Sequence, residues 1–372
     1  MYISHFDYDH VSGITNLVKQ VQIDRFVIPM LPVSQRLFCL ASSLFPSIYH
    51  YGDGNPPNDD ENVGDIDEWY WGFIANPATA LREAAGNAAE VQQIEPTAGM
   101  TEERGPYLND PEREFVLSNL DISSGYVPYA SDLELQAVTN RRGVLKVVND
   151  TGAPVWEFKT CILKDAQNQA TFFVQELKRM NLINDESDLE NVDILKKLVM
   201  NHHNSGLKAA YKKAVAQIGV SHTLNITSLM LYSGTVLGQR IRCYRSKAAP
   251  PDRPEIRAWP DVAGWIGYGD VSLRAKKRLN EVIDAFEKYR KRTYIIAPPH
   301  HGSPRDWSPR LLEGFGSNGT SVPTCVFGAD GSYNHPGHRV LLDVNSSGGT
   351  AIVVTSDPRS RWTDSLTVYI EA

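Results

Sequence analysis

Four side chains that commonly bind metal ions stand near the start of the chain, in the stretch MYISHFDYDH. They are His5, Asp7, Asp9 and His10. Side chains alternate along an extended segment, so the first three would lie on one side, and a turn at residues 9–10 would bring His10 toward the same point. Two nitrogen and two oxygen donors suit zinc or manganese better than magnesium, which prefers oxygen ligands and retained water. The spacing favours a metal site over a polar loop with incidental histidines.

Polar side chains also follow two runs that are typical of buried strands. Asp270 ends the run GWIGYGD, and it is interpreted either as a metal ligand or as the N-cap of a helix predicted over 272–290. His300, His301 and Ser303 follow the run TYIIAPP. Adjacent histidines point in different directions, so we expect one to face a metal and the other a substrate or a supporting group, rather than a solvated turn. Strand ends are held by a stiff sheet, which makes such positions typical of functional sites.

For the remaining histidine clusters, an ordinary structural role competes more strongly with metal binding. Asn334 and His335 follow the strand-like run PTCVFG, but Asn, Pro and Gly are also ordinary turn residues. His202 and His203 follow a helical pattern with no strand before them, so we interpret them as a helix end and a loop. His222 precedes a strand-like run and is interpreted as a surface histidine, with a role as an extra ligand as the alternative.

Composition and motifs exclude several classes of protein. The chain has four cysteines, none of which forms a CxxC pair: Cys39, Cys161, Cys243 and Cys325. It has neither a secretory leader pattern nor an apolar run of about 18 residues. We therefore expect a reduced cytoplasmic protein and no membrane partner. A net charge of -7 argues against broad adhesion to nucleic acid, and the locally basic stretch 274–292 is interpreted as a solvated helix face. The sequence has no GxSxG nucleophile elbow, P-loop or GxGxxG motif.

Short apolar runs alternate with helical patterns along the chain, which predicts layered α/β structure. Strands are expected at 25–31, 133–139, 143–148, 155–163, 223–233, 264–270, 293–299, 323–328, 350–355 and 365–370. Helices are expected at 12–21, 77–89, 166–180, 188–200, 207–218 and 272–290. The acidic, turn-rich and then aromatic segment 51–72 is predicted to be a surface loop.

Five stretches in order, SHFDYDHVSG, NITSLML, GYGD, PPHHGS and SYNHPGHRVL, resemble the metallo-β-lactamase-fold hydrolases, and specifically the hydrolase domain of ComEC-type competence proteins. That branch carries HxDxDH in place of the wider HxHxDH pattern, as residues 5–10 do. An Asn-x-x-Ser strand matches 225–228, and a His-His-Gly-Ser element matches 300–303. The resemblance covers about 11–31 and 223–341.

The resemblance implies an α/β (α+β) fold, a four-layer αββα sandwich. Its N-terminal part would span 1–45, a large insertion 46–220, and its C-terminal part 221–372. Members of this fold begin with strands before the metal motif, whereas only Met1–Ser4 precede His5. We therefore expect that the first strands are missing, through a start assigned at an internal methionine, with a truncated paralogue as the alternative.

The resemblance also implies the roles of the site residues. His5 and Asp7 match ligands of a first metal, Asp9 and His10 those of a second, Asp270 the bridging carboxylate and His300 the last histidine ligand. One or two Zn²⁺ or Mn²⁺ ions would lower the pKa of a bridging water, which would attack phosphorus or a carbonyl. Asp9 would orient that water, and His301 or His335 would donate a hydrogen bond or a proton. Substrate contacts would come from Asn225, Ser303 and Asn334.

Three functions remain open from the sequence. The first is a metal-dependent hydrolase of phosphodiesters in nucleic acid or a nucleotide, which rests on the resemblance to the competence branch. The second is hydrolysis of a lactone, amide or thioester at the same site. The third is a non-catalytic sensor or scaffold, by resemblance part of a bacterial defence-type system, with a protein partner bound through 46–220 and first of all through 51–72.

Overall fold

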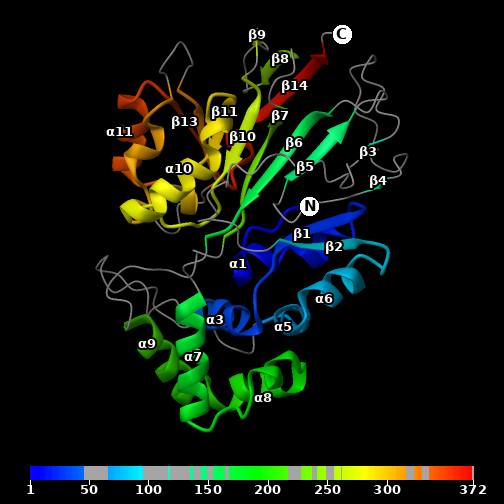
Figure 1. Cartoon of the computed structure of the whole chain (residues 1–372), viewed down its shortest axis with the longest axis vertical. Helices are drawn as coiled ribbons and strands as arrows, with labels where there is room; N and C mark the ends of the chain where they lie inside the picture. Colours follow the sequence, from blue (N-terminus) through cyan, green and yellow to red (C-terminus); the bar gives the residue numbers. More distant parts are fainter. Residues whose placement is uncertain are drawn as a thin grey trace, which may run out of the picture. The chain divides into compact units, whose positions relative to one another are not determined.

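The structure is a computed structural model, and its description is limited to defined parts of the chain. It describes residues 1–45, 66–94, 116–117, 135–136, 144–148, 154–163, 167–216, 228–236, 241–248, 255–260, 262–315, 322–328 and 335–370. The chain divides into two compact units. Unit 1 comprises Met1–Pro96 and Ile162–Leu229, and unit 2 comprises Thr97–Cys161 and Met230–Ala372. Figure 1 labels the helices and strands of both units.

Unit 1 contains a short parallel strand pair. Strand β1 (Arg25–Pro29) pairs with β2 (Glu90–Ile94), and an ion pair joins Arg25 to Glu90 across their first residues. The N-terminus lies along β1, because Ile3 N donates to Val27 O at 3.0 Å and Val27 N donates to Met1 O at 2.8 Å. Strand β1 is buried over most of its length, which confirms the strand predicted at 25–31.

Helices make up most of the rest of unit 1 (Figure 1). They are α1 (Tyr8–Val11), α2 (Ile14–Leu17), α3 (Val33–Leu44), α5 (Glu68–Ala75), α6 (Pro77–Ala84), α7 (Gln167–Arg179), α8 (Val192–His202) and α9 (Lys208–Ala216), with a 3-10 turn at Glu186–Glu190. The rings of Phe38, Phe173 and Tyr211 pack with centroids 5.0 to 6.0 Å apart, which joins α3, α7 and α9 in one core.

Most helices predicted in unit 1 are confirmed. Helix α6 begins as predicted, because the Asn76 side chain accepts a hydrogen bond from Thr79 N at 3.1 Å and Pro77 occupies the first turn. Helices α7, α8 and α9 coincide with the three predicted patterns between 166 and 218. The helix predicted at 12–21 is confirmed only over Ile14–Leu17, the short helix α2. The helix end predicted at 202–203 is confirmed, because α8 ends at His202, but the loop is wrong, because a π-helical turn, His203–Leu207, links α8 to α9.

The predicted surface loop at 51–72 is wrong at its aromatic end. Helix α5 begins after Asp67, whose side chain accepts from Trp69 N at 3.0 Å, and it buries Tyr70 and Trp71. The aromatic residues that suggested an exposed partner surface instead fill the core of unit 1. The remainder of that stretch, 51–65, lies outside the described residues.

Unit 2 is built on a mixed sheet of seven strands in the order β13-β12-β11-β10-β7-β6-β5. Their bounds are β5 Val144–Val148, β6 Pro154–Cys161, β7 Met230–Thr235, β10 Gly264–Gly267, β11 Thr293–Ala297, β12 Thr324–Gly328 and β13 Thr350–Val354. Strands β10 to β13 pair in parallel, whereas β5, β6 and β7 pair antiparallel, as do β7 and β10. The carboxyl ends of β10, β11 and β12 therefore share one edge of the sheet.

Two helices and further strands complete unit 2. Helix α10 (Lys276–Arg290) packs on the sheet where Tyr289 meets Tyr232 of β7, with ring centroids 4.5 Å apart, and α11 is His338–Ser346. Strands β8 (Ile241–Ala248), β9 (Glu255–Pro260) and β14 (Thr363–Ile370) form an antiparallel sheet, and β3 (Val116–Leu117) pairs with β4 (Leu135–Gln136). The chain is thus a mixed α/β protein of the α+β kind.

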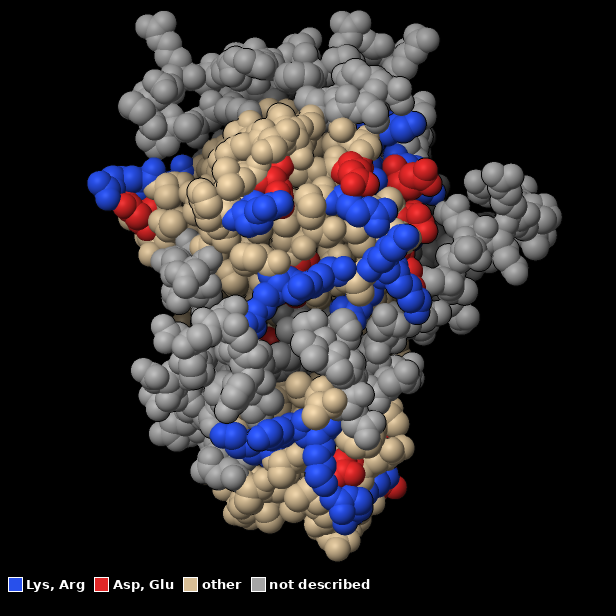
Figure 2. Space-filling view, turned by 90° about the vertical axis from the view of Figure 1, so that its left-hand side faces the viewer, with Lys and Arg blue, Asp and Glu red and all other residues tan. Residues whose placement is uncertain are grey.

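The basic helix α10 is only partly a solvated face. Three of its lysines are exposed, namely Lys276, Lys277 and Lys288. The Lys277 Nζ atom lies 3.7 Å from Glu281 Oε1. Arg290 instead donates from Nη2 to Leu311 O at 3.0 Å and stacks over the Phe315 ring. On the face in Figure 2, Lys and Arg side chains lie beside Asp and Glu side chains. Among the described helices, none is both long and apolar enough to cross a membrane.

Candidate functional site

The unit 1 part of the candidate site is a pair of histidines. His5 follows the segment that lies along β1 and is 1% exposed, while His10 is in the short helix α1. Their ring centroids are 3.8 Å apart. The predicted approach of these two side chains is confirmed, but the extended geometry through Asp9 is wrong, because α1 begins at Tyr8. One helical turn after Asp7, rather than a turn at residues 9–10, brings His10 back to His5.

Two serines orient the His5 ring. Its Nδ1 lies 2.9 Å from Ser4 Oγ and 3.5 Å from Ser228 Oγ, and Ser228 is held nearby because Leu229 N donates to Ser4 O at 2.5 Å. When Nδ1 carries the proton and donates to a serine, Nε2 presents the lone pair that binds a metal. We did not predict either serine as a site residue, although Ser228 is the last residue of the Asn-x-x-Ser match.

The unit 2 part of the candidate site is centred on a tight turn after β11. His300, His301 and Gly302 have φ values of 45°, 53° and 85°, so three consecutive residues are left-handed. This conformation costs about 1 kcal/mol or more for each non-glycine residue and persists only where the surrounding structure enforces it. His300 N donates to Gly269 O at 2.9 Å, which ties the turn to the end of β10. Strain of this kind is typical of functional sites.

His300 is held between two carboxylates. Its Nδ1 lies 2.6 Å from Asp306 Oδ2, and its Nε2 lies 3.8 Å from Asp270 Oδ2. Burial raises the pKa of Asp306, but hydrogen bonds with His300, Ser272 and Ser303 outweigh it and hold that pKa below its ordinary value. The interpretation of Asp270 as a helix N-cap is wrong, because Ala275 occupies the N-cap of α10. Asp270 is 6% exposed, and it is positioned by the end of β10.

The other predicted residues of unit 2 surround this turn. The His335 ring centroid lies 5.4 Å from that of His300, and burial together with His300 and His301 lowers the pKa of His335 to about 4. The planes of His300 and His301 differ by 63°, as expected for adjacent histidines that point in different directions. Ser303 is buried, and its Oγ accepts a hydrogen bond from Arg305 N at 3.3 Å, which stabilises the turn.

Some predicted residues are not described. Asn225, His222 and Asn334 lie outside the described residues, and the side chain of Asp9 is not described either. Asp7 is the N-cap residue of α1, without a side-chain hydrogen bond to that helix. We did not predict Asp306, because it comes three residues after the His-His-Gly-Ser element and resembles an ordinary loop aspartate in the sequence.

The donors present fit a transition metal. Unit 1 supplies the imidazoles of His5 and His10, and unit 2 supplies the Asp270 carboxylate beside His300. Two imidazoles and a carboxylate are donors of the kind that zinc and manganese accept. The orientation of His5 by serines and of His300 by Asp306 is the arrangement that metal-binding histidines usually have, with a partner for the nitrogen that does not bind the metal.

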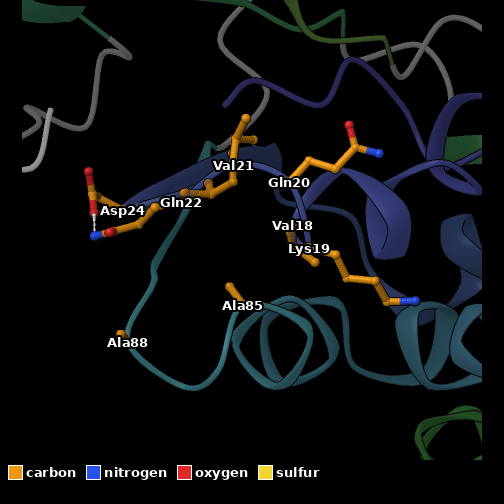
Figure 3. A pocket seen from close by; sticks show the side chains of 9 residues that line it. Val18, Lys19, Gln20, Val21, Gln22, Asp24, Ala85 and Ala88 are labelled. Carbon is orange, nitrogen blue, oxygen red and sulfur yellow. Dashed lines mark hydrogen bonds between the residues drawn. The ribbon is translucent and has the colours of Figure 1, made fainter. Parts of the chain in front are cut away.

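A cavity of about 510 Å³ lies elsewhere in unit 1 (Figure 3). It is bordered by the segment Val18–Asp24, between α2 and β1, and by Ala85 and Ala88 after α6. Gln22 Nε2 donates to Asp24 Oδ1 at 2.7 Å along one side. None of the predicted site residues is among those that line it, so this cavity is not the candidate metal site.

Replacing Gly302 with alanine should destabilise unit 2 and disturb the histidine turn. The new Cβ would lie 2.6 and 2.7 Å from ring carbons of Phe327 and 2.8 Å from Pro336 Cβ, at a backbone position with φ of 85°. We expect a loss of about 3 kcal/mol in the free energy of unfolding, measured by urea denaturation. Gly348→Ala is the matched control, because Gly348 has φ of 81° but no neighbour within 4 Å of the new Cβ. It should lose only about 1 kcal/mol, and equal losses in the two variants would contradict the packing argument.

Comparison of the chain with protein-family models, with curated proteins and with solved structures finds no match in any of the three.

Proposed function

We propose that the chain is a metal-dependent hydrolase that cleaves phosphodiester bonds in nucleic acid or a nucleotide. The observation that carries the proposal is the arrangement of histidines within each unit: His5 and His10 lie together in unit 1, and in unit 2 His300 lies between Asp270 and Asp306. The left-handed turn at His300 and His301 supports it, because a fold retains such strain where the position of the side chains matters. The order of the motifs along the chain supports a four-layer αββα sandwich as the finer architecture, and we propose it on that basis.

The ligands proposed are His5, His10, Asp270 and His300, with Asp7 and Asp9 as further candidates. When bound, zinc or manganese supplies a Lewis acid that makes water a stronger nucleophile and stabilises negative charge on the reacting oxygen atoms. The buried position of His5 and Asp270 keeps bulk water away from the donors, which strengthens their interaction with a cation.

The remaining polar groups would act on the substrate. The side chains of His301 and His335 stand beside His300, where an N–H of either ring can donate to a phosphoryl oxygen or to the leaving group. Asp9 would orient the attacking water. Ser303 contributes by holding the turn, since its hydroxyl is engaged with the turn and with Asp306.

A substrate panel tests the proposal. Purified protein would be assayed with manganese or zinc on bis-p-nitrophenyl phosphate, single-stranded DNA, a lactone and nitrocefin. We expect hydrolysis of the phosphodiesters that chelation by EDTA abolishes and added metal restores. Activity only on the lactone or on nitrocefin would replace phosphodiesters by acyl substrates. If the protein binds neither metal and hydrolyses nothing, the enzymatic proposal fails and a scaffold role takes its place.

A further inference from the structure

We infer that Asp306 is a positioning residue for His300: its carboxylate accepts the Nδ1 proton, so that Nε2, on the side of the ring that faces Asp270, is the nitrogen left to bind a cation. The two contacts on opposite sides of the ring carry this inference. Nδ1 lies 2.6 Å from Asp306 Oδ2, and Nε2 lies 3.8 Å from Asp270 Oδ2. The consequence for metal binding rests on the proposed function, whereas the state of the His300 ring does not.

Asp306 is rigid enough for this role. It is 3% exposed, its backbone N donates to Ser303 O at 3.1 Å, and its backbone O accepts from Leu273 N at 2.9 Å. The carboxylate also interacts with the side chains of Ser272 and Ser303. Two separate segments, the histidine turn and the segment before α10, therefore hold the carboxylate in place. A side chain held in this way can select one orientation of its partner ring.

The hydrogen bond between Asp306 and His300 determines how Asp306 would affect metal binding. A carboxylate that accepts the Nδ1 proton favours the tautomer in which Nε2 carries no proton, and it makes Nε2 a stronger donor to a cation. At the corresponding nitrogen His5 has serine hydroxyls, whereas His300 has a carboxylate. The left-handed backbone at His300 orients the imidazole ring, and the Asp306 carboxylate selects the tautomer of that ring. Outer partners of this type typically change metal affinity by about 10- to 100-fold.

The test compares Asp306→Asn with Asp343→Asn. The asparagine at 306 keeps the size of the side chain but removes the charge that selects the Nδ1–H tautomer. Asp343 is the matched control, because its carboxylate accepts from Trp307 Nε1 and from Arg339 Nε, each at 3.1 Å, and neither of these residues is a proposed ligand. Nitrogen-15 spectra of the metal-free protein, recorded at a pH high enough that the His300 ring is neutral, would report its tautomer, and calorimetric titration with zinc or manganese would report the affinity.

We expect the Nδ1–H tautomer of His300 in the unaltered protein and in Asp343→Asn, and its loss in Asp306→Asn. We also expect Asp306→Asn to weaken metal binding about 10- to 100-fold and Asp343→Asn to leave it unchanged. An Nε2–H tautomer in the unaltered protein, or equal metal affinity in all three proteins, would overturn the inference. If the unaltered protein binds no metal but His300 shows the predicted tautomer, the proposed function fails and the positioning by Asp306 stands.

Discussion

His300→Asn is expected to reduce the affinity for zinc or manganese by more than about 100-fold and to lower phosphodiester hydrolysis to the background rate. The imidazole is the proposed ligand, and its Nε2 faces Asp270 at 3.8 Å while Asp306 holds the other nitrogen. Asparagine is the preferred replacement, because it tolerates the left-handed backbone at this position better than alanine. Calorimetric metal titration and initial rates on bis-p-nitrophenyl phosphate measure the two effects.

His338→Ala provides the control for this variant. His338 begins helix α11, is exposed, and belongs to none of the proposed ligand positions. It should bind metal and hydrolyse substrate like the unaltered protein. His5→Ala should match His300→Asn if both histidines serve the same function. Unchanged affinity in His300→Asn and His5→Ala, with circular dichroism showing both variants folded, would remove the metal centre from the proposal.

Arg36→Met is expected to destabilise unit 1 by about 3 kcal/mol in the free energy of unfolding. Arg36 is in α3 and is 6% exposed, and burial lowers its pKa to about 10. Its Nη1 donates to Ile74 O at 2.7 Å and to Ala75 O at 2.5 Å, the last carbonyls of α5. Methionine fills much of the volume but leaves those buried carbonyls without a donor, and each costs about 1–3 kcal/mol.

Urea denaturation followed by circular dichroism measures the loss, and hydrogen exchange of the peptide that contains α5 shows whether it is local. Arg82→Met is the matched control, because Arg82 is on α6, where its side chain is exposed. That variant should change stability by no more than about 0.5 kcal/mol. A similar loss in both variants would mean that the cost comes from removing a positive charge rather than from uncapping α5.

The sequence was most informative where an apolar pattern repeated over several residues. The strand at 25–31, the helices after 166 and the parallel strands of unit 2 were all predicted, because burial of one face requires a period that is visible in the sequence. The helix at Glu68–Ala75 was missed, because its run of aromatic residues, WYWGF, has no clear helical period. Its acidic, turn-rich neighbours then made a surface loop the better interpretation.

In the candidate site, too, the sequence revealed some features and not others. The donor types were readable, since His5 and His10 stand five positions apart and His300 is adjacent to His301. The partners of those donors were not. Ser4 and Asp306 are of residue types common in any loop, and nothing in their spacing distinguishes a partner of a histidine from a solvated side chain.

By itself, therefore, the sequence determined the chemistry available to this protein, namely histidine and carboxylate donors at the ends of strand-like runs in an α/β pattern. Only the tertiary structure decided which of them meet. Strands β10 and β11 are parallel neighbours, so their carboxyl ends bring Asp270 and His300 together across 29 residues of intervening chain. The left-handed turn and the start of α1 at Tyr8 aim the rings, because both depend on backbone conformations that packing enforces and local propensity does not.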